Sequence, residues 1–400
     1  MENKYDVILI GAGVVGLSTA LHIQVERPDL SVLVLEKEQE VAGHQSSHNS
    51  GVLHSGIYYK PGSLRAINCK KGYDRMLAFC QKHDIPHEVC GKIIVATNKA
   101  EAERLGGILE RGQANGLTGI RRISGEEARE IEPNVQALEA IWVPQAGIVN
   151  YETVARKYKE LILKNGGAVH VGSKVKKIIP QANMVQVETS ERSYQAACLV
   201  NCAGLYSDKI AHLAGLRPQT QILPFRGEYY ELKPESQHLV RNLIYPLPNP
   251  AFPFLGVHFT RMIEGGIEAG PNAVFAFGRE AYHKSNINLP ELFESLGFPG
   301  LWQLAKKYHK EAWLEFQRSY SKAHFVKALQ NLIPSIQSSD LAPGRSGVRA
   351  MACAPNGDLL DDFLFIEVPR MVHVLNAPSP AATASLAIGE TVAEKVLKQF

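Results

Sequence analysis

The stretch YDVILIGAGVVGLSTALHI, residues 5–23, decides the fold class. Its apolar run 7–10 is uninterrupted, as expected of a strand that is covered on both faces. Gly11, Gly13 and Gly16 then form the G-x-G-x-x-G pattern of a dinucleotide-binding turn. Such glycines permit a tight turn, let the backbone approach a pyrophosphate, and let the helix pack close to the strand. The stretch therefore predicts a strand, a turn and a helix whose N-terminus binds phosphate.

Glu36 extends this pattern. The segment SVLVLEKE, residues 31–38, is a second apolar strand, and Glu36 lies at its end. It follows Gly11 by about 25 residues, near the spacing of an acidic side chain that binds a ribose 2′-hydroxyl group. An acid here favours a nucleotide without a 2′-phosphate. The chain has one complete fingerprint and no reactive cysteine pair, which separates it from disulfide-reductase-like flavoenzymes with a second site for NAD(P)H.

The composition excludes several other classes. The 400 residues carry a formal net charge of +3, too small to indicate nucleic-acid binding. The 6 cysteines form no C-x-x-C pair, so neither a metal site nor a redox dithiol is expected, and reduced thiols in a cytosolic protein are the simplest interpretation. The N-terminal apolar run is short and ends in glycines, unlike a signal peptide. No apolar stretch reaches the roughly 18 residues that a membrane span requires.

Four segments together resemble a known family. They are the fingerprint with Glu36, HQSSHNSGVLHSGIYY (44–59), LVNCAGLYSDKIA (199–211), and the pair GRSGVRAMACAPNGDLLDDFLF (344–365) and VLNAPSPAATASLAIGE (374–390). In these segments the chain resembles the D-amino acid oxidase/glycerol-3-phosphate dehydrogenase superfamily of FAD oxidoreductases. Within it, NSGVLHSGIYY, FLGVHFTR and GPNAVFAFGREAY are similar to the L-2-hydroxyglutarate dehydrogenase/oxidase branch.

The resemblance implies one non-covalent FAD per chain. The loop 44–59, dense in small and hydrogen-bonding residues, would run under the flavin ring, and the last helix would point its N-terminus at the flavin. For each serine, a role in capping or turn formation remains an open alternative. Besides the fingerprint glycines and Glu36, the implied cofactor-binding residues are Ser46, Ser47, Asn49, Ser50, Gly51, Ala203, Gly204, Gly347, Pro380 and Ala381.

The predicted architecture is an α/β fold in which a Rossmann-like FAD-binding domain is interleaved with a mixed-sheet α+β substrate domain. The FAD-binding domain would take residues 1–85, 150–215 and 344–400, and the substrate domain residues 86–149 and 216–343. Local patterns predict helices over 61–85 and 99–116, a strand pair over 86–97, a capped helix over 124–133, and a helix followed by a strand over 150–180.

Oxidation of an α-hydroxy acid moves the C2 hydrogen as hydride to a flavin while the hydroxyl proton leaves. The site needs a cation for the carboxylate, a base near the hydroxyl, and exclusion of water. Arg349, in SGVRA between glycine-rich segments, is the predicted cation, because a guanidinium matches a carboxylate with two parallel hydrogen bonds. A structural ion pair is the alternative for this arginine.

Two histidines compete for the role of base. In LGVHFTR the alternation of a strand places His258 opposite its apolar neighbours, and a near-neutral imidazole suits a base at physiological pH. A buried histidine with satisfied hydrogen bonds is the alternative. His54 lies in the loop expected under the flavin, where it is either the base or a covalent attachment point. We take His258 as the first prediction.

A dicarboxylate such as 2-hydroxyglutarate needs a second cation. Arg226, Arg261 and Lys60 are candidates, and Tyr58 and Tyr59 are possible donors to substrate oxygens. The sequence does not rank them.

The leading functional hypothesis is FAD-dependent oxidation of L-2-hydroxyglutarate to 2-oxoglutarate. An amine or amino-acid oxidase of the glycine- or sarcosine-oxidase type would share the fold and cofactor. A non-catalytic flavoprotein is a third class, and Arg349 and His258 beside the flavin argue against it.

Residues 298–334 bear on the electron acceptor. Aromatic and aliphatic residues recur at helical spacing, and lysines flank them, as in a helix that lies in a membrane interface. This interpretation predicts a cytoplasmic protein held peripherally on the inner face of the cytoplasmic membrane, with quinone as acceptor. The alternative is a pair of helices whose apolar face is core, in a soluble enzyme that uses oxygen. The apolar positions are Leu301, Leu304, Ala305, Tyr308, Ala312, Trp313, Phe316 and Tyr320.

Overall fold

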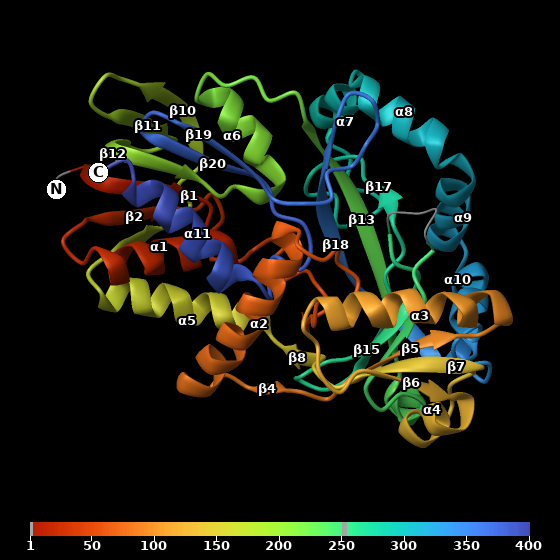
Figure 1. Ribbon diagram of the computed structural model, residues 1–400. Helices are drawn as coiled ribbons and strands as arrows, with labels where there is room; N and C mark the ends of the chain where they lie inside the picture. The colour runs from red at the N-terminus through yellow and green to blue at the C-terminus, as the bar shows by residue number, and fades with distance from the viewer. Residues whose placement is uncertain (1–2, 250–253) are drawn as a thin grey trace.

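The computed structural model describes residues 3–249 and 254–400 and contains two large sheets that stand next to each other (Figure 1). The first, 8-stranded sheet has the order β10-β11-β12-β1-β2-β9, with β20 beside β12 and β19 beside β20. Its central strand β1 pairs in parallel with β2 and with β12. The strands are β1 (Lys4–Ile10), β2 (Val32–Leu35), β9 (Ala168–His170), β10 (Val175–Pro180), β11 (Val185–Thr189), β12 (Ser193–Asn201), β19 (Leu364–Val368) and β20 (Met371–Asn376).

Helices cover both faces of this sheet, which is why β1 reads as an uninterrupted apolar run. Val7 and Leu9 pack with α1 and α11 on one face, and Ile8 and Ile10 pack with α6 on the other. The Rossmann-like prediction is therefore confirmed. The helices around the sheet are α1 (Val14–Glu26), α2 (Leu64–Lys82), α5 (Tyr151–Lys164), α6 (Ser207–Leu213) and α11 (Ser385–Leu397).

The second sheet has 9 strands in the order β17-β13-β16-β15-β14-β5-β7-β6, with β18 beside β13. It is antiparallel except where β14 pairs in parallel with β5. Its strands are β5 (Lys92–Ala96), β6 (Arg121–Ser124), β7 (Glu139–Val143), β13 (Gln221–Leu232), β14 (Leu243–Pro246), β15 (His258–Arg261), β16 (Ile267–Gly270), β17 (Val274–Phe275) and β18 (Leu341–Cys353). A 3-stranded sheet of β3 (Val52–Leu53), β8 (Gly147–Val149) and β4 (His87–Glu88) lies below the junction in Figure 1.

The remaining helices belong to the second domain. They are α3 (Lys99–Ala114), α4 (Gly125–Ile131), α7 (Leu289–Leu296), α8 (Pro299–Lys307), α9 (His309–Tyr320) and α10 (Lys322–Gln330). The predicted capping residue Ser124 begins α4 with a full capping box, because its side chain accepts from the Glu127 N–H while the Glu127 side chain accepts from Ser124. The predicted helices over residues 61–85 and 99–116 are likewise confirmed by α2 and α3. Residues 86–97 contain two strands, but these do not form the predicted pair, because β4 pairs with β8 in the small sheet whereas β5 pairs with β7 and β14.

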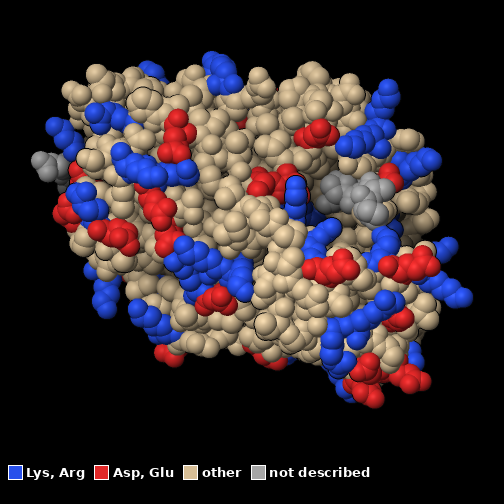
Figure 2. Space-filling view, in the orientation of Figure 1, with Lys and Arg blue, Asp and Glu red and all other residues tan. Residues whose placement is uncertain are grey.

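The chain crosses between the two sheets several times, as the interleaved architecture requires. The predicted return to the first domain at residue 344 falls inside β18, and β18 pairs with β13 along nearly its whole length. The chain rejoins the first sheet only at β19. This long antiparallel pair brings the SGVRA segment to the junction of the domains. On the face in Figure 2, acidic and basic side chains are interspersed, without a large area of one sign.

Candidate active site

The turn between β1 and α1 has the geometry that the fingerprint predicts. Gly11 has φ +102°, and a Cβ atom there would lie 2.5 Å from the Cys202 carbonyl oxygen. A Cβ on Gly16 would collide with the Gly11 carbonyl. One donor of the helix N-terminus is already used, because the Val14 N–H donates to Ser46 Oγ over 3.0 Å. Ser46 therefore caps α1, and the other N–H groups of the first turn remain for phosphate.

Glu36 is held rigidly against this turn. Its Oε2 accepts from the Ala12 N–H over 2.8 Å and its Oε1 accepts from the Glu38 N–H over 3.0 Å. The residue is 8% exposed and lines the cavity described next. Each carboxylate oxygen has a second lone pair, so Glu36 is able to accept from ribose hydroxyl groups without giving up its backbone contacts.

A cavity of about 1200 Å³ extends from the fingerprint turn into the second domain. It exceeds the roughly 300–1,000 Å³ of an ordinary ligand pocket, so it has room for a dinucleotide and a small substrate together. Most of the residues predicted from the sequence line it. These are Gly11, Gly13, Glu36, Ser46, Asn49, Ser50, His54, Tyr58, Tyr59, Ala203, Gly204, His258, Gly347, Arg349, Pro380 and Ala381.

Three residues predicted to bind the cofactor lie outside the cavity. Gly16 packs α1 against the turn, as its fingerprint role requires. Ser47 donates its hydroxyl to the Ala42 carbonyl over 2.7 Å and so stabilises its own turn, the alternative that the sequence left open for each serine. Gly51 is needed for the pairing of β3 with β8, because a Cβ there would lie 2.8 Å from the Val149 carbonyl.

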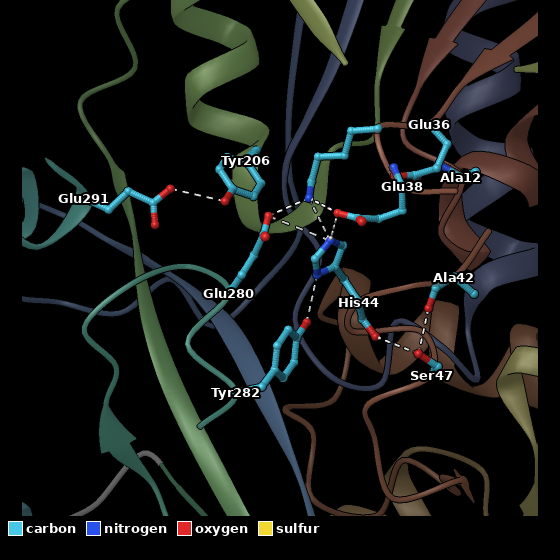
Figure 3. A network of polar contacts seen from close by, with 11 residues as sticks. Ala12, Glu36, Glu38, Ala42, His44, Ser47, Tyr206, Glu280, Tyr282 and Glu291 are labelled. Carbon is cyan, nitrogen blue, oxygen red and sulfur yellow. Dashed lines mark hydrogen bonds and ion pairs between the residues drawn. The ribbon is translucent and has the colours of Figure 1, made fainter. Parts of the chain in front are cut away.

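A charged network ties the loop 44–59 to the second domain (Figure 3). Lys37 forms ion pairs with Glu38 and, over 2.5 Å, with Glu280. His44 Nδ1 lies 2.9 Å from the Tyr282 hydroxyl. The side chains of Glu38, His44 and Glu280 lie close enough together to bind a cation. The Lys37 ammonium group lies among them, 2.9 Å from His44 Nε2, and is the positive charge of this cluster. Its hydrogen bond to Glu38 lowers the pKa of that carboxyl group. The sequence reasoning missed this network.

His258 is placed as a proton acceptor. It begins β15, is 6% exposed, and its ring stacks on Tyr245 with centroids 4.0 Å apart. Nδ1 lies 3.0 Å from the Gly256 carbonyl oxygen. A carbonyl only accepts, so Nδ1 carries the proton and Nε2 keeps its lone pair. Burial lowers the pKa of His258 to about 3, and a bound dianion would raise it again.

His54 lies close to His258 on the same cavity. Its main chain is fixed by a hydrogen bond from its N–H to Thr383 Oγ1 over 3.1 Å. Burial, together with the positive charges of Lys92 and Arg65, lowers the pKa of His54 to about 3. The structure thus brings both predicted histidines together, and both are uncharged at neutral pH.

Arg349 lies on β18 opposite Phe225 of β13. Its Nη1 donates to the Asn272 carbonyl over 3.3 Å, and the guanidinium lies 5.7 Å from the Phe254 ring centroid. Among residues 3–249 and 254–400, no carboxylate forms an ion pair with it. The alternative of a structural ion pair therefore finds no support, and the guanidinium is available to a carboxylate in the cavity.

None of the three candidates for the second cation, Arg226, Arg261 and Lys60, lines the cavity. Arg226 is buried outside the cavity, where it pairs with Glu228 over 3.0 Å. Arg261 pairs with Glu88 over 2.5 Å, also outside it. Tyr58 and Tyr59 do line the cavity, and in the described part of the chain the Tyr58 hydroxyl is buried without a hydrogen-bond partner.

Comparison with known proteins assigns the chain to a family. The model of the DAO family, described as FAD dependent oxidoreductase, matches residues 6–395. The chain belongs to this FAD-dependent oxidoreductase family. The L-2-hydroxyglutarate dehydrogenase of Indibacter alkaliphilus is 53% identical, covering 99% of this chain and 100% of that protein. The mitochondrial L-2-hydroxyglutarate dehydrogenase of Homo sapiens is 40% identical over 100% of this chain and 90% of that protein.

Solved structures share the FAD-dependent oxidoreductase fold. L-α-glycerophosphate oxidase from Mycoplasma pneumoniae, solved with FAD bound, superposes with a TM-score of 0.80 at 23% identity, over 99% of this chain and 95% of that chain. Glycine oxidase from Geobacillus kaustophilus superposes with a TM-score of 0.76 at 16% identity, over 99% and 95%. At these identities the likeness concerns the fold alone.

The residues of the cavity fit FAD. Glu36 is positioned for the ribose, the first turn of α1 for the pyrophosphate, and Gly13 has no side chain where the backbone must approach. A Cβ on Gly347 would collide with the His48 carbonyl, so this glycine lets β18 approach the loop 44–59. The small residues Ala203, Gly204, Pro380 and Ala381 line the same space.

FAD is expected to be held without a covalent bond. His54 is the residue at which the sequence left a covalent link open, and it lines the cavity. Acid precipitation of the purified protein should leave the yellow colour in the supernatant, measured by its flavin absorbance. A yellow pellet would contradict this expectation, and peptide mapping would then test His54 as the attachment residue.

Proposed function

We propose that this protein oxidises L-2-hydroxyglutarate to 2-oxoglutarate. The proposal is carried by two residues on one cavity beside the FAD-binding turn. The Arg349 guanidinium has no carboxylate partner among the described residues, and the His258 imidazole donates through Nδ1 and so keeps the lone pair of Nε2. The full-length similarity to proteins named L-2-hydroxyglutarate dehydrogenase supports it.

The residues divide the work of the reaction. Arg349 binds the C1 carboxylate with two parallel hydrogen bonds and so fixes the orientation of C2. His258 Nε2 accepts the proton of the C2 hydroxyl, and the Gly256 carbonyl stabilises the Nδ1–H of the imidazolium that forms. Bound FAD would supply the two-electron acceptor for the C2 hydrogen. With the hydroxyl proton held on His258 Nε2, the loss of two hydrogens from the substrate is balanced.

A substrate panel tests the proposal. The purified protein is assayed with an artificial dye as electron acceptor, and the product is identified by mass. L-2-hydroxyglutarate should give 2-oxoglutarate in equal amount to the reduced dye. Glycine, sarcosine and glycerol 3-phosphate should give little turnover. Faster turnover of an amino acid would replace the proposal with the amine-oxidase alternative.

The orientation of α9, at the outer edge of the second domain, bears on the identity of the electron acceptor (Figure 1). The helix buries two polar residues and exposes its aromatic side. Glu315 accepts from the Ala273 N–H over 2.8 Å, and Ser319 donates to Glu228 over 2.7 Å. The outward side carries Trp313 and Tyr320, which are 60% and 58% exposed.

The exposed aromatic residues form one continuous surface. The rings of Trp313 and Phe316 stack at 5.7 Å between centroids, and those of Phe316 and Tyr320 lie 4.5 Å apart. The predicted single apolar face is therefore split, because Leu301 and Leu304 pack into the core. The alternative that the whole face is core is wrong for the aromatic part.

We propose that this aromatic surface docks on a membrane and that quinone accepts the electrons there. Trp302 on α8 is 59% exposed and Phe293 on α7 is 66% exposed, so the apolar surface extends to the neighbouring helices. Exposed Lys306 and Lys310 would contact anionic headgroups. In the described residues, no helix combines the length and the hydropathy needed to cross a bilayer.

The surface predicts binding to anionic liposomes. Wild-type protein should sediment with the liposomes at low salt, and simultaneous replacement of Trp313, Phe316 and Tyr320 by serine should weaken binding at least about 10-fold, since burial of apolar area drives it. Because the three residues are exposed, FAD content should not change.

A matched variant controls for the loss of exposed apolar side chains elsewhere on the surface. Val25, Ile67 and Leu163 are also exposed but lie on helices of the first domain, and their replacement by serine should leave liposome binding unchanged. If the wild type stays in the supernatant at low salt and turns over as fast with oxygen as with a quinone analogue, the membrane proposal fails and a soluble oxidase remains.

A further inference from the structure

Lys92, the first residue of β5, is a buried cation without a counterion. It is 1% exposed, and within residues 3–249 and 254–400 it forms no ion pair. An unpaired charge in such a position destabilises a folded protein, and lysine is almost never found there unless it is paired. A partner from outside the chain would remove this cost.

The Lys92 ammonium group lies against two tyrosine rings that line the cavity. Nζ lies 4.8 Å from the Tyr58 ring centroid and 4.8 Å from the Tyr245 ring centroid. Both tyrosines line the cavity, and Tyr245 stacks on His258. The positive charge therefore acts on the part of the cavity where the proposed proton acceptor lies.

A dicarboxylate substrate presents two negative charges, and of the cations predicted from the sequence only Arg349 lines the cavity. Arg349 is available for the C1 carboxylate, whereas Arg226 and Arg261 are paired elsewhere. We propose, resting on the proposed function, that Lys92 determines specificity for a dicarboxylate: its charge balances the second carboxylate across the rings of Tyr58 and Tyr245.

Lys92 is the group in this region whose charge changes near neutral pH. Burial lowers the pKa of Lys92 to about 8. Its titratable neighbours do not interfere: the pKa values of His54 and His258 are lowered to about 3, burial raises the pKa of Cys69 to about 12, and burial raises those of Tyr58 and Tyr245. A bound dianion favours the charged form of Lys92, so binding and protonation are coupled.

Replacement by methionine tests the charge with little change of shape. In Lys92→Met, the ratio of kcat/KM for L-2-hydroxyglutarate to kcat/KM for its C5 methyl ester should fall about 30-fold, the Coulomb factor for unit charges about 8 Å apart at an effective dielectric constant of about 20. The loss should lie in KM. The matched variant Lys82→Met, at an exposed position of α2, should keep the wild-type ratio.

The wild type supplies a second test that does not depend on a variant. Binding of 2-oxoglutarate and of 2-oxopentanoate is followed by the flavin spectrum as the pH is raised. The dicarboxylate should weaken by up to about 30-fold as pH passes 8 and Lys92 loses its charge, and the monocarboxylate should change little.

The outcomes separate the two proposals. The assignment of Lys92 alone is overturned if the wild type oxidises L-2-hydroxyglutarate but Lys92→Met keeps the wild-type ratio of kcat/KM for the acid and its ester. It is also overturned if the affinities for the two keto acids change in parallel with pH. No turnover of L-2-hydroxyglutarate by the wild type overturns the proposed function, and the assignment of Lys92 with it.

Discussion

Replacement of Arg349 by alanine is expected to lower kcat/KM for L-2-hydroxyglutarate by at least about 100-fold, corresponding to about 3 kcal/mol of transition-state stabilisation. The guanidinium makes one hydrogen bond to the Asn272 carbonyl, over 3.3 Å, and its remaining donors are available for a carboxylate. Without it, the C1 carboxylate has no paired cation and C2 is no longer oriented.

Arg349→Lys separates charge from geometry. It keeps the positive charge but loses the planar fork, so an intermediate loss is expected. FAD content, measured by flavin absorbance after release, should equal that of the wild type in both variants. Near-normal kcat/KM in Arg349→Ala would remove this residue from the substrate site.

Replacement of His258 by alanine is expected to slow flavin reduction by L-2-hydroxyglutarate by roughly 100-fold or more, because the hydroxyl proton loses its acceptor. The measurement is the limiting rate of flavin bleaching under anaerobic conditions at saturating substrate. Added imidazole should restore part of the rate, since the truncation leaves space beside Tyr245, the ring on which His258 stacks.

The variant His54→Ala shows which of the two histidines is the base. Both histidines line the cavity, and both are neutral, but the hydrogen bond to Gly256 fixes the tautomer of His258. We therefore expect a smaller loss in His54→Ala. An unchanged rate in His258→Ala with a large loss in His54→Ala would transfer the role of base to His54.

The parts of the site that the sequence predicts correctly depend on short-range patterns. The turn of Gly11 and Gly13, with Glu36 at the end of β2, follows from strand–turn–helix geometry that a few residues determine. Strand alternation around His258, and the place of Arg349 between glycine-rich segments, predicted both residues, and the structure brings both to one cavity.

The predicted site residues that lie outside the cavity have partners that a linear pattern mostly does not show. Arg261 pairs with Glu88, which lies far away in sequence. The ion pair of Arg226 could have been predicted from the sequence, because Glu228 follows two residues later on the same strand and so lies on the same face. Ser47 stabilises its own turn, a use of serine that the sequence analysis left open.

Buried polar groups explain the remaining differences. Helical periodicity placed Trp313 and Leu304 on one face, but Glu315 turns inward to bind a backbone N–H and so rotates the aromatic side of α9 outward. Lys92 was missed because it precedes the apolar run IIVA and reads as the polar start of a strand. Its burial depends on Tyr58 and Tyr245, which approach from other segments.

Anaerobic titration of the FAD-loaded protein with the two enantiomers of 2-hydroxyglutarate tests the central claim most directly. The account predicts that one equivalent of L-2-hydroxyglutarate bleaches the flavin and yields one equivalent of 2-oxoglutarate, while the D-enantiomer leaves the flavin oxidised over the same time. Equal bleaching by both enantiomers, or no bleaching by L-2-hydroxyglutarate, would contradict it.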